Sequence, residues 1–533
     1  GGLIMLSHTR QTMKMILVFL LITAGTRAQV PDQPNTDNCT SIIVGRLASA
    51  DGSTMTSHSC DSGTDRTWIN LVPGQSHNKE DSTFVYMRPK RWQSADDPNR
   101  LPLGSIPQPE ETYTFMNAAY PIMNEHQLAI GETTTGGKRE LRSEEGIINA
   151  PELYRLVLQR AKTAREAIRI ADELTKTYGY IDWGECFTFA DPQEVWQFEI
   201  AGPGRGNTGA VWAAQRIPDD QIGVSANAFR IRSLDLENED YYMASDNIYS
   251  LAEELGLWDP DSGKEFEFCY VYGDRHSLYC RRREWRVLSL LAPSLELHPE
   301  SENYPFSVVP EKKVTVKDIL NLFRDTYEGT SYDMTKNMLV RKHYRPTEYE
   351  KEHNVVEMTK SPVANPFLSG HWRTLLQIER ERTIATSYAT YVQVTQSREW
   401  LPDEIGGLVW LGYDNPATSV HLPFYIGIDQ MPDSYLEGGR DGFSRDCAWW
   451  AFRRVGKLSY QRYWGLKDQI ETVWSAIEDS SFSKQADIEA KALTLYKKDP
   501  EAARDFLTSY SHTTAQEAIE AYWKLGDKLL SQL

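Results

Sequence analysis

Residues 39–62 read CTSIIVGRLASADGSTMTSHSCDS, and they carry the strongest structural signal in the chain. The run Ser41 to Val44 is rich in residues that favour strands, and Ala50-Asp51-Gly52 has the composition of a turn. A second strand-like run, Ser53 to His58, follows directly. The segment therefore predicts a β-hairpin.

The register of this hairpin brings two polar residues together. Folding the chain about residues 50–52 places Cys39 opposite residues 60–64, and Asp61 lies within that window. Taken alone, a cysteine at the start of a strand behaves as a small buried hydrophobic residue. A chemical role for Cys39 therefore needs further support.

The same segment resembles the mature N-terminus of the dipeptidase A and secernin family of N-terminal nucleophile (Ntn) hydrolases. Members of this family begin, after processing, with Cys-Thr, an apolar strand, Val-Gly, an Asp-Gly-Ser-Thr turn and then Asp-Ser. The matching residues here are Cys39-Thr40, Val44-Gly45, Asp51 to Thr54 and Asp61-Ser62.

Further blocks of this resemblance follow in order and cover roughly residues 39–410. They are Met123 to Gln127 with Gly131 to Thr134, Gly184 to Trp196, Ser225 to Asn227 with Arg230-Ile231, and Tyr391 to Val394 with Leu401 to Gly407. The helical tail beyond them carries no motif of the family.

The resemblance implies an α+β protein with the four-layer αββα Ntn fold. It also implies that Cys39 becomes the first residue of the mature enzyme and attacks peptide carbonyls. The thiol is then the nucleophile, and the α-amine of the same residue, with a reference pKa of about 7.7 to 8.0, is the base. No histidine partner is required, which agrees with the lack of a clear Cys-His motif.

Three further residues receive catalytic roles from the resemblance. Asp61 is expected to hold the Cys39 amine, the alternative being a cap of an Asx-turn. Asn227 is expected to donate a hydrogen bond to the oxyanion, where one good donor contributes roughly 3 kcal/mol. Arg230 is expected either to support Asn227 or to stabilise its strand.

Two candidate substrate-binding residues complete the set. Thr133 is a weaker oxyanion candidate. His58 marks a departure, because family members often carry Arg-Asn shortly before the Asp, where this chain has His58-Ser59. Loss of a permanent cation there is expected to alter the thiol pKa or the way a substrate carboxylate is held.

The first 28 residues are typical of an export signal. Lys14 precedes an apolar run from Met15 to Thr23, and Thr26-Arg27-Ala28 resembles a signal-peptidase site. Residues 29–38 would then be a propeptide that Cys39 removes by cleaving Asn38-Cys39. We expect a secreted or periplasmic protein, with no membrane attachment after signal removal because no later apolar stretch reaches 18 residues.

The acidic composition argues against nucleic acid as a partner. The 533 residues include 75 acidic and 57 basic ones, and the formal charge of −18 would repel a phosphate backbone. The sequence also lacks HExxH, CxxC, GxSxG and Walker motifs. We therefore expect no metal and no cofactor.

Regular elements are predicted along the rest of the chain. The expected strands are Gln127 to Glu132, Phe187 to Ala190, Val195 to Ile200 and Val211 to Ile217, with a turn at Asp191 to Gln193. Thr163 and Glu166 have capping-box spacing before an apolar stripe that ends at Gly179. Thr514 and Glu517 have the same spacing and predict a helix start.

These elements suggest the domain organisation. We expect a catalytic domain over residues 39–460, with a loop-rich insertion at about 300–370, and a helical region over 461–533. Cys269 and Cys280 flank a turn-like stretch between strand-like segments and are placed for a disulfide across a hairpin, while two buried free thiols explain the sequence equally well.

The function predicted from the sequence is that of a cysteine dipeptidase acting on small peptides through a thioester on Cys39. One alternative is an acylase that cleaves non-peptide amides, as in the related penicillin V acylases and bile salt hydrolases. Another is a non-catalytic secreted binding protein on the same fold, since fold alone does not give function. Self-association into a homo-oligomer is left open by the sequence.

Overall fold

The computed structural model of the protein describes residues 38–88, 100–274, 277–341, 356–360, 364–376, 381–440 and 442–533. The predicted signal peptide and residues 29–37 of the predicted propeptide lie outside this part. Within it, no helix combines the length and apolar character needed to cross a bilayer.

The largest sheet has eight antiparallel strands. Their order is β15 (Tyr242–Ala244), β13 (Val211–Ile217), β12 (Val195–Ala201), β11 (Gly184–Ala190), β10 (Ala129–Thr134), β9 (Met123–Asn124), β8 (Phe115–Asn117) and β3 (Asn70–Val72). Every residue of β10, β11 and β12 is buried, so this sheet is covered on both faces.

The two strands of the predicted hairpin lie in two different, smaller antiparallel sheets. One has the order β2 (Ser57–Cys60), β19 (Tyr391–Gln396), β20 (Leu408–Tyr413) and β21 (Leu422–Tyr425), and the other has the order β1 (Ser41–Val44), β14 (Ile222–Ser225) and β16 (Ser307–Val308). Both β1 and β2 contact β10 of the largest sheet.

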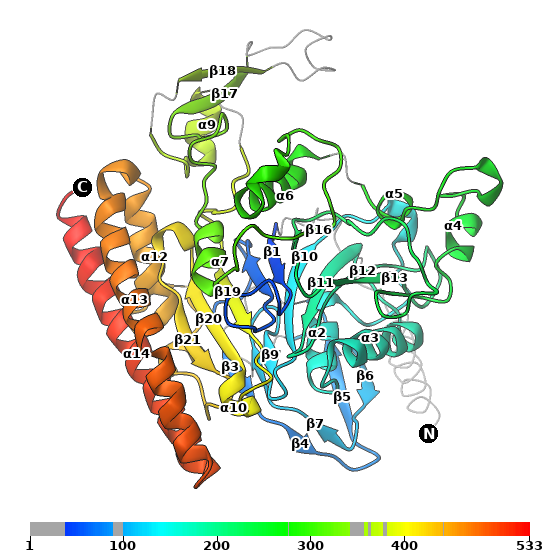
Figure 1. The fold of residues 1–533 in the computed structure, drawn as a ribbon, viewed down its shortest axis with the longest axis horizontal. Helices are drawn as coiled ribbons and strands as arrows, with labels where there is room; N and C mark the ends of the chain where they lie inside the picture. The colour runs from blue at the N-terminus through cyan, green and yellow to red at the C-terminus, as the bar shows by residue number, and fades with distance from the viewer. Residues whose placement is uncertain are drawn as a thin grey trace, which may run out of the picture. The chain divides into compact units, whose positions relative to one another are not determined.

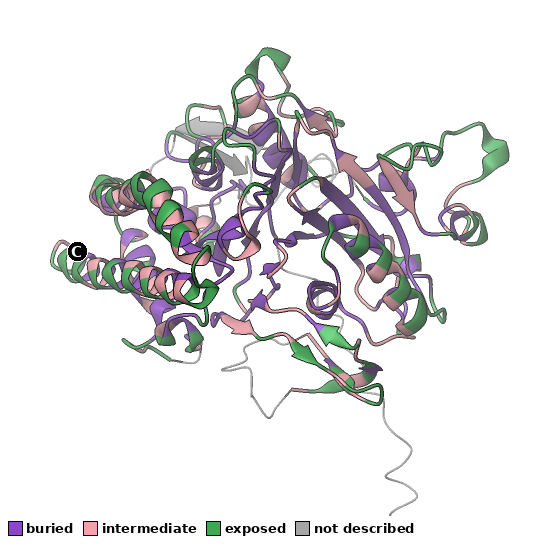
Figure 2. Cartoon of the chain, turned by 60° about the horizontal axis from the view of Figure 1, so that its bottom comes forward, coloured by how far each residue is buried: buried purple, intermediate pink, exposed green. Residues whose placement is uncertain are grey.

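Helices cover the outer faces of these sheets (Figure 1). On one side α2 (Ala150–Leu158) packs on α3 (Ala164–Tyr178), which contacts β11 and β12. On the other side α12 (Ala448–Ser459), α13 (Tyr463–Tyr496) and α14 (Pro500–Leu530) contact β20 and β21. Figure 2 shows the central strands buried, some peripheral strands exposed, and the outer surface of the long helices exposed. The α+β class with antiparallel sheets is therefore confirmed.

The predicted helix ending at Gly179 is confirmed as α3. The Thr163 side chain accepts a hydrogen bond from the Glu166 amide, while the Glu166 carboxylate accepts one from the Lys162 amide. Gly179 follows the last turn with φ of +72°, and a Cβ there would lie 2.4 Å from the Glu145 carbonyl oxygen. Glycine therefore satisfies both the backbone angle and the close approach.

The predicted strands of the large sheet are confirmed with small changes at their ends. Val211 to Ile217 matches β13 in full. Between β11 and β12, the Asp191 carboxylate accepts from the amides of Gln193 and Glu194, which fixes the predicted turn.

The helix start predicted from Thr514 and Glu517 was wrong. Both residues lie inside α14, whose N-cap is Asp499, with its side chain accepting from the Glu501 amide and Pro500 in the first turn. A Thr and a Glu three residues apart also occur inside helices. Asp-Pro is the stronger start signal because proline has no amide hydrogen for the helix to leave unpaired.

The structure decides between the two possibilities that the sequence left open for Cys269 and Cys280. Cys269 lies in α5 (Phe268–Val271) and Cys280 lies in α6 (Leu278–Leu291), so helices rather than strands flank the turn. None of the six cysteines, which all lie in the described part of the chain, forms a disulfide, and all six are buried. Of the two possibilities, the one with two buried thiols is therefore correct.

The region from 300 to 370 contains short elements in its described part. They are β16, α7 (Val316–Phe323), β17 (Asn337–Arg341) and β18 (Val356–Lys360). Helix α7 begins with a full capping box between Thr315 and Asp318 and contacts β19. Part of this region therefore packs on the sheet that contains β2.

Candidate active site

The hairpin around Cys39 has the predicted register. Antiparallel bridges join Thr40 to Ser59 and Val44 to Met55, and the Asn38 amide donates to the Asp61 carbonyl at 3.4 Å. Cys39 therefore lies opposite Cys60, one residue before Asp61. The Cys39 side chain is fully buried.

Arg283 of α6 holds the backbone of Cys39. Its Nη1 donates to the Cys39 carbonyl at 2.6 Å and to Thr40 Oγ1 at 3.0 Å. Its Nη2 donates to the Ala226 carbonyl at 3.0 Å and to Asn227 Oδ1 at 2.8 Å. The fully buried guanidinium thus connects the predicted nucleophile to the predicted oxyanion donor.

Asn227 follows β14 in a left-handed conformation, with φ of +64°. Asparagine tolerates this conformation better than most residues. Its Nδ2 donates to the Thr134 carbonyl at 2.7 Å, and its Oδ1 accepts from Arg283. These two contacts fix the orientation of the amide. Its second N–H can still donate a hydrogen bond.

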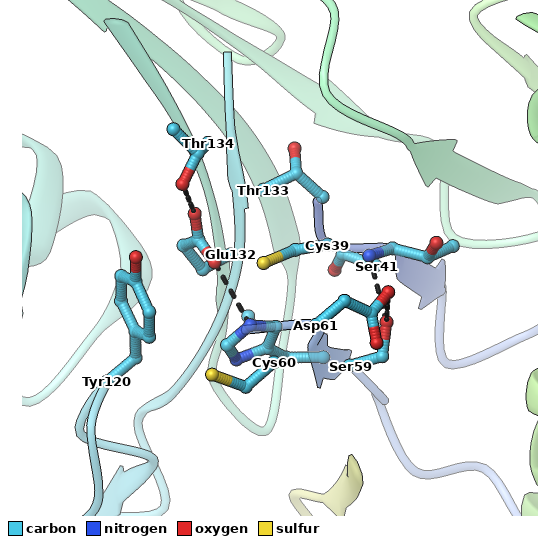
Figure 3. A network of polar contacts seen from close by, with 12 residues as sticks. Cys39, Ser41, Ser59, Cys60, Asp61, Tyr120, Glu132, Thr133 and Thr134 are labelled. Atoms are coloured by element: carbon cyan, nitrogen blue, oxygen red, sulfur yellow. Dashed lines mark hydrogen bonds and ion pairs between the residues drawn. The ribbon is translucent and has the colours of Figure 1, made fainter. Parts of the chain in front are cut away.

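Asp61 lies at the end of β2 and is almost fully buried. Its Oδ2 accepts from Ser59 Oγ at 3.0 Å (Figure 3) and from Arg382 Nη2. Its Oδ1 has no hydrogen-bond partner among the described residues. Burial raises the pKa of Asp61, and the charges of Arg382 and Arg283 oppose that rise.

Arg382 also contacts the bond that the predicted maturation would cleave. Its Nη2 donates to the Asn38 carbonyl at 2.7 Å, and its Nη1 donates to the carbonyls of Thr383 and Ile384. One buried guanidinium therefore joins the carbonyl before Cys39 to the carboxylate of Asp61.

His58 and Glu132 lie on the other side of Cys39. His58 Nε2 is 3.0 Å from Glu132 Oε2, and both side chains are fully buried. Glu132 Oε1 accepts a hydrogen bond from Thr134 Oγ1 at 2.7 Å (Figure 3), and the Cys39 sulfur lies within 4.8 Å of a Glu132 carboxylate oxygen. His58 therefore has no exposed surface with which to bind substrate in this state.

The pKa values of the neighbouring buried carboxyl groups of Glu132 and Glu185 are shifted in opposite directions. Burial alone would raise the pKa of Glu132, but its contacts with His58 and Glu185 lower that pKa to about 2. Burial and the Glu132 charge raise the pKa of Glu185 well above its usual range. Glu132 is therefore the carboxylate and Glu185 the acid at neutral pH.

The two remaining predicted residues have contacts of a different kind. Thr133 Oγ1 is 2.5 Å from Ser225 Oγ, and both side chains are fully buried. The Arg230 guanidinium donates to the carbonyls of Val224, Pro305 and Phe306 and pairs with Glu284 at 3.3 Å. These contacts agree with the alternative given above, that Arg230 stabilises its strand.

Sequence reasoning missed three residues that contact Cys39 or its neighbours. Glu132 belongs to a family block but had been given no role. Arg283 ends a run of three arginines beside the apolar residues of a helix, and a charged run inside an apolar pattern was a signal available in the sequence. Arg382 had no such signal.

A pocket of about 220 Å³ opens beside Arg382. Its lining is mixed and includes Phe367, Arg373, Glu381 and Tyr388. The Glu381 carboxylate pairs with Arg282. The pocket therefore offers both charges and an apolar wall close to the Asn38 carbonyl.

Comparison with known proteins identifies the family of this chain. The profile of peptidase family C69 matches residues 38–476. A "Probable dipeptidase" of Latilactobacillus sakei is 26% identical over 93% of this chain and 95% of its own. A "Probable dipeptidase B" of Lactococcus lactis subsp. lactis is 26% identical over 92% and 95%, and a "Dipeptidase" of Bifidobacterium longum is 23% identical over 81% and 79%. The match begins one residue before Cys39 and spans most of the chain, so the protein belongs to peptidase family C69.

Proposed function

We propose that this peptidase is an exported cysteine dipeptidase whose nucleophile is Cys39, freed by cleavage of the Asn38-Cys39 bond. One observation carries the proposal: Arg382 joins the Asn38 carbonyl, directly before Cys39, to the buried Asp61 carboxylate, while Arg283 holds the Cys39 carbonyl. Export rests on the signal-like residues 1–28 alone.

Maturation is proposed to begin at the carbonyl that Arg382 contacts. The Cys39 sulfur attacks the Asn38 carbonyl carbon, the C–N bond breaks, and the nitrogen leaves as the Cys39 α-amine. Water then hydrolyses the resulting thioester and frees the thiol. Arg382 Nη2, 2.7 Å from the Asn38 oxygen, would stabilise the negative charge that develops on that oxygen.

The liberated amine is proposed to act as the base in substrate hydrolysis. Asp61 Oδ1 is a buried acceptor with no hydrogen-bond partner among the described residues, so it can accept a hydrogen bond from this amine. The amine takes the thiol proton and returns it to the leaving amine of the peptide. Water then resolves the thioester and releases the acyl product.

Asn227 is proposed to stabilise the oxyanion of the substrate. Its orientation is fixed by Arg283 on one side and the Thr134 carbonyl on the other, so little reorganisation is needed when the charge forms. Arg230 is left out of the reacting group because its contacts lie with Glu284 and backbone carbonyls.

We also propose that the protein has the four-layer αββα Ntn fold. Helices contact the outer sides of two antiparallel sheets, and β1 and β2 contact β10 between them. In this arrangement the N-terminal nucleophile would lie at the start of a central strand, which is where β1 begins.

Small peptides are the proposed substrates. The relatives named as dipeptidases support this class. The pocket beside Arg382 supports it too, because Glu381 can pair with a substrate amine and Arg373 with a carboxylate. An acylase would instead need an apolar pocket for the acyl group. Few aromatic residues line this pocket, Phe367 being one of them, so the lining favours a peptide.

The N-terminal residue of the purified protein tests the proposal. Expressed with its first 38 residues, the wild type should show Cys39 as its terminus by mass spectrometry, and Cys39→Ala should keep residue 38. The processed protein should hydrolyse a dipeptide panel and leave phenoxyacetyl and bile amides intact. A wild type that hydrolyses dipeptides while Asn38-Cys39 stays intact would refute the mechanism.

The wild type and Cys39→Ala also distinguish the proposed enzyme from a non-catalytic binding protein. If Cys39→Ala retains both the mass and the ligand binding of the wild type, and neither hydrolyses any peptide, the binding role is correct. The buried charged donors around Cys39 argue against that result. Burying a charged group costs free energy, and a protein without catalysis would gain nothing from these groups.

A further inference from the structure

The side chains around Cys39 form a set of metal-ligand atoms. Cys39 Sγ, a nitrogen of His58 and a carboxylate oxygen of Glu132 all lie within 4.8 Å of one another. All three residues are fully buried. Neither ring nitrogen of His58 makes a hydrogen bond of good geometry within the described part of the chain; Nε2 has only its close contact with Glu132.

These three groups are ligands that zinc prefers. Thiolate, imidazole and carboxylate bind Zn²⁺ at about 2.0 to 2.3 Å, which places tetrahedral ligand atoms roughly 3.3 to 3.8 Å apart. The observed spacing is compatible with such a site after small side-chain rotations.

Maturation would add a fourth ligand. An N-terminal cysteine offers its α-amine as well as its thiolate, and together they close a five-membered chelate ring on one metal ion. The uncleaved chain lacks this amine because its nitrogen is an amide. A complete tetrahedral set, with two ligands from Cys39, therefore rests on the proposed maturation.

We propose that the mature enzyme binds one Zn²⁺ through Cys39, His58 and Glu132, and that this ion inhibits it reversibly. Coordination occupies the electron pairs of both the nucleophile and the base, and it releases the thiol proton to solvent. The thiolate and Glu132 balance the ion's charge, while Arg382 is paired with Asp61. The positively charged Arg283 guanidinium, which donates to the Cys39 carbonyl, repels a zinc ion bound nearby. This repulsion weakens zinc binding, so the ion can be removed.

The test begins with protein whose Cys39 terminus has been verified by mass. Zinc is titrated against a chromogenic chelator, and Co²⁺ is used as a probe of thiolate-to-metal charge transfer. The wild type should bind one equivalent, and EDTA should restore full peptidase activity. His58→Gln should weaken binding at least about tenfold, as should Glu132→Gln if the histidine variant does not fold.

The matched control is His126→Gln. His126 also pairs with a carboxylate, Asp403, at 3.6 Å, but it belongs to a different, partly exposed site. This variant should bind zinc as tightly as the wild type. The uncleaved protein should bind more weakly than the mature form.

Several results would overturn the inference. Zinc binding that His58→Gln and Glu132→Gln leave unchanged would place the ion elsewhere. Loss of activity on EDTA treatment, with recovery on adding zinc, would make the ion a requirement and not an inhibitor. If Cys39 is never the terminus, the proposed maturation fails first, and the mass measurement reports that failure separately.

Discussion

Arg283 and Cys39 are 244 positions apart in the chain, yet Arg283 Nη1 donates to the Cys39 carbonyl at 2.6 Å inside the core. The other end of the guanidinium contacts Asn227 at 2.8 Å. A planar group with several fixed donors can hold both residues at once, which a lysine ammonium cannot. Arg283 is thus a positioning residue for the nucleophile and the oxyanion donor.

Arg283→Lys should keep the charge and lose this geometry. We expect kcat/KM on a dipeptide to fall roughly 10- to 100-fold, because a displacement of about 1 Å at the reacting atoms can cost that much. Arg281→Lys is the control, since Arg281 lies on the same helix and donates to the Glu300 carbonyl. Equal activity of the two variants would show that Arg283 does not position Cys39.

Arg382→Gln should slow maturation. The variant loses the donor on the Asn38 carbonyl, and removal of one oxyanion donor costs about 10²- to 10³-fold in rate. The uncleaved mass should therefore persist in a time course in which the wild type is fully processed. Arg373→Gln, which changes the same pocket without contacting Asn38, should mature at the wild-type rate.

The local parts of this structure were the predictable ones. The alternation of the hairpin fixed the register of Cys39 against residues 60 and 61, and capping and glycine signals fixed both ends of α3. Such patterns depend only on neighbours in sequence. The same reasoning failed at Thr514, where a capping pattern lies inside a long helix.

The residues that complete the site were not predictable in this way. Arg382 contacts Asn38 across 344 positions, and no periodicity links the two segments. Their meeting depends on how the sheets pack, and a single sequence does not encode that in any local pattern. The strand-like segments expected around Cys269 and Cys280 are helices in the structure.

Glu185→Gln should change how stability depends on pH. The raised pKa of Glu185 means that the folded protein keeps this proton, while the unfolded chain releases it above about pH 4.3. The raised pKa therefore lowers the free energy of unfolding. This loss is absent below that pH and grows by up to about 1.4 kcal/mol per pH unit as pH rises toward the folded pKa. Glutamine does not ionise, so the variant is free of this loss.

The free energies of unfolding of wild type and Glu185→Gln, measured by urea denaturation between pH 4 and 8, check this prediction. The variant should gain stability relative to the wild type as pH rises. Glu194→Gln is a control outside this buried pair, since Glu194 pairs with Arg165. A constant difference across the range would mean that Glu185 is ionised in the folded protein.

Asn227→Asp should separate catalysis from folding. Aspartate keeps the shape of the side chain and still accepts from Arg283, but it loses the hydrogen bond to the Thr134 carbonyl, so packing is verified together with the kinetics. It loses the N–H donors and adds a negative charge where the oxyanion would form. We expect kcat to fall about 10²- to 10³-fold with little change in KM, because the lost interaction belongs to the transition state. Steady-state kinetics on a dipeptide, with near-ultraviolet circular dichroism to verify packing, measure both. If kcat stays near the wild-type value in a well-folded variant, the oxyanion is stabilised by another donor, and Arg382, already aimed at a carbonyl beside Cys39, is the residue to examine next.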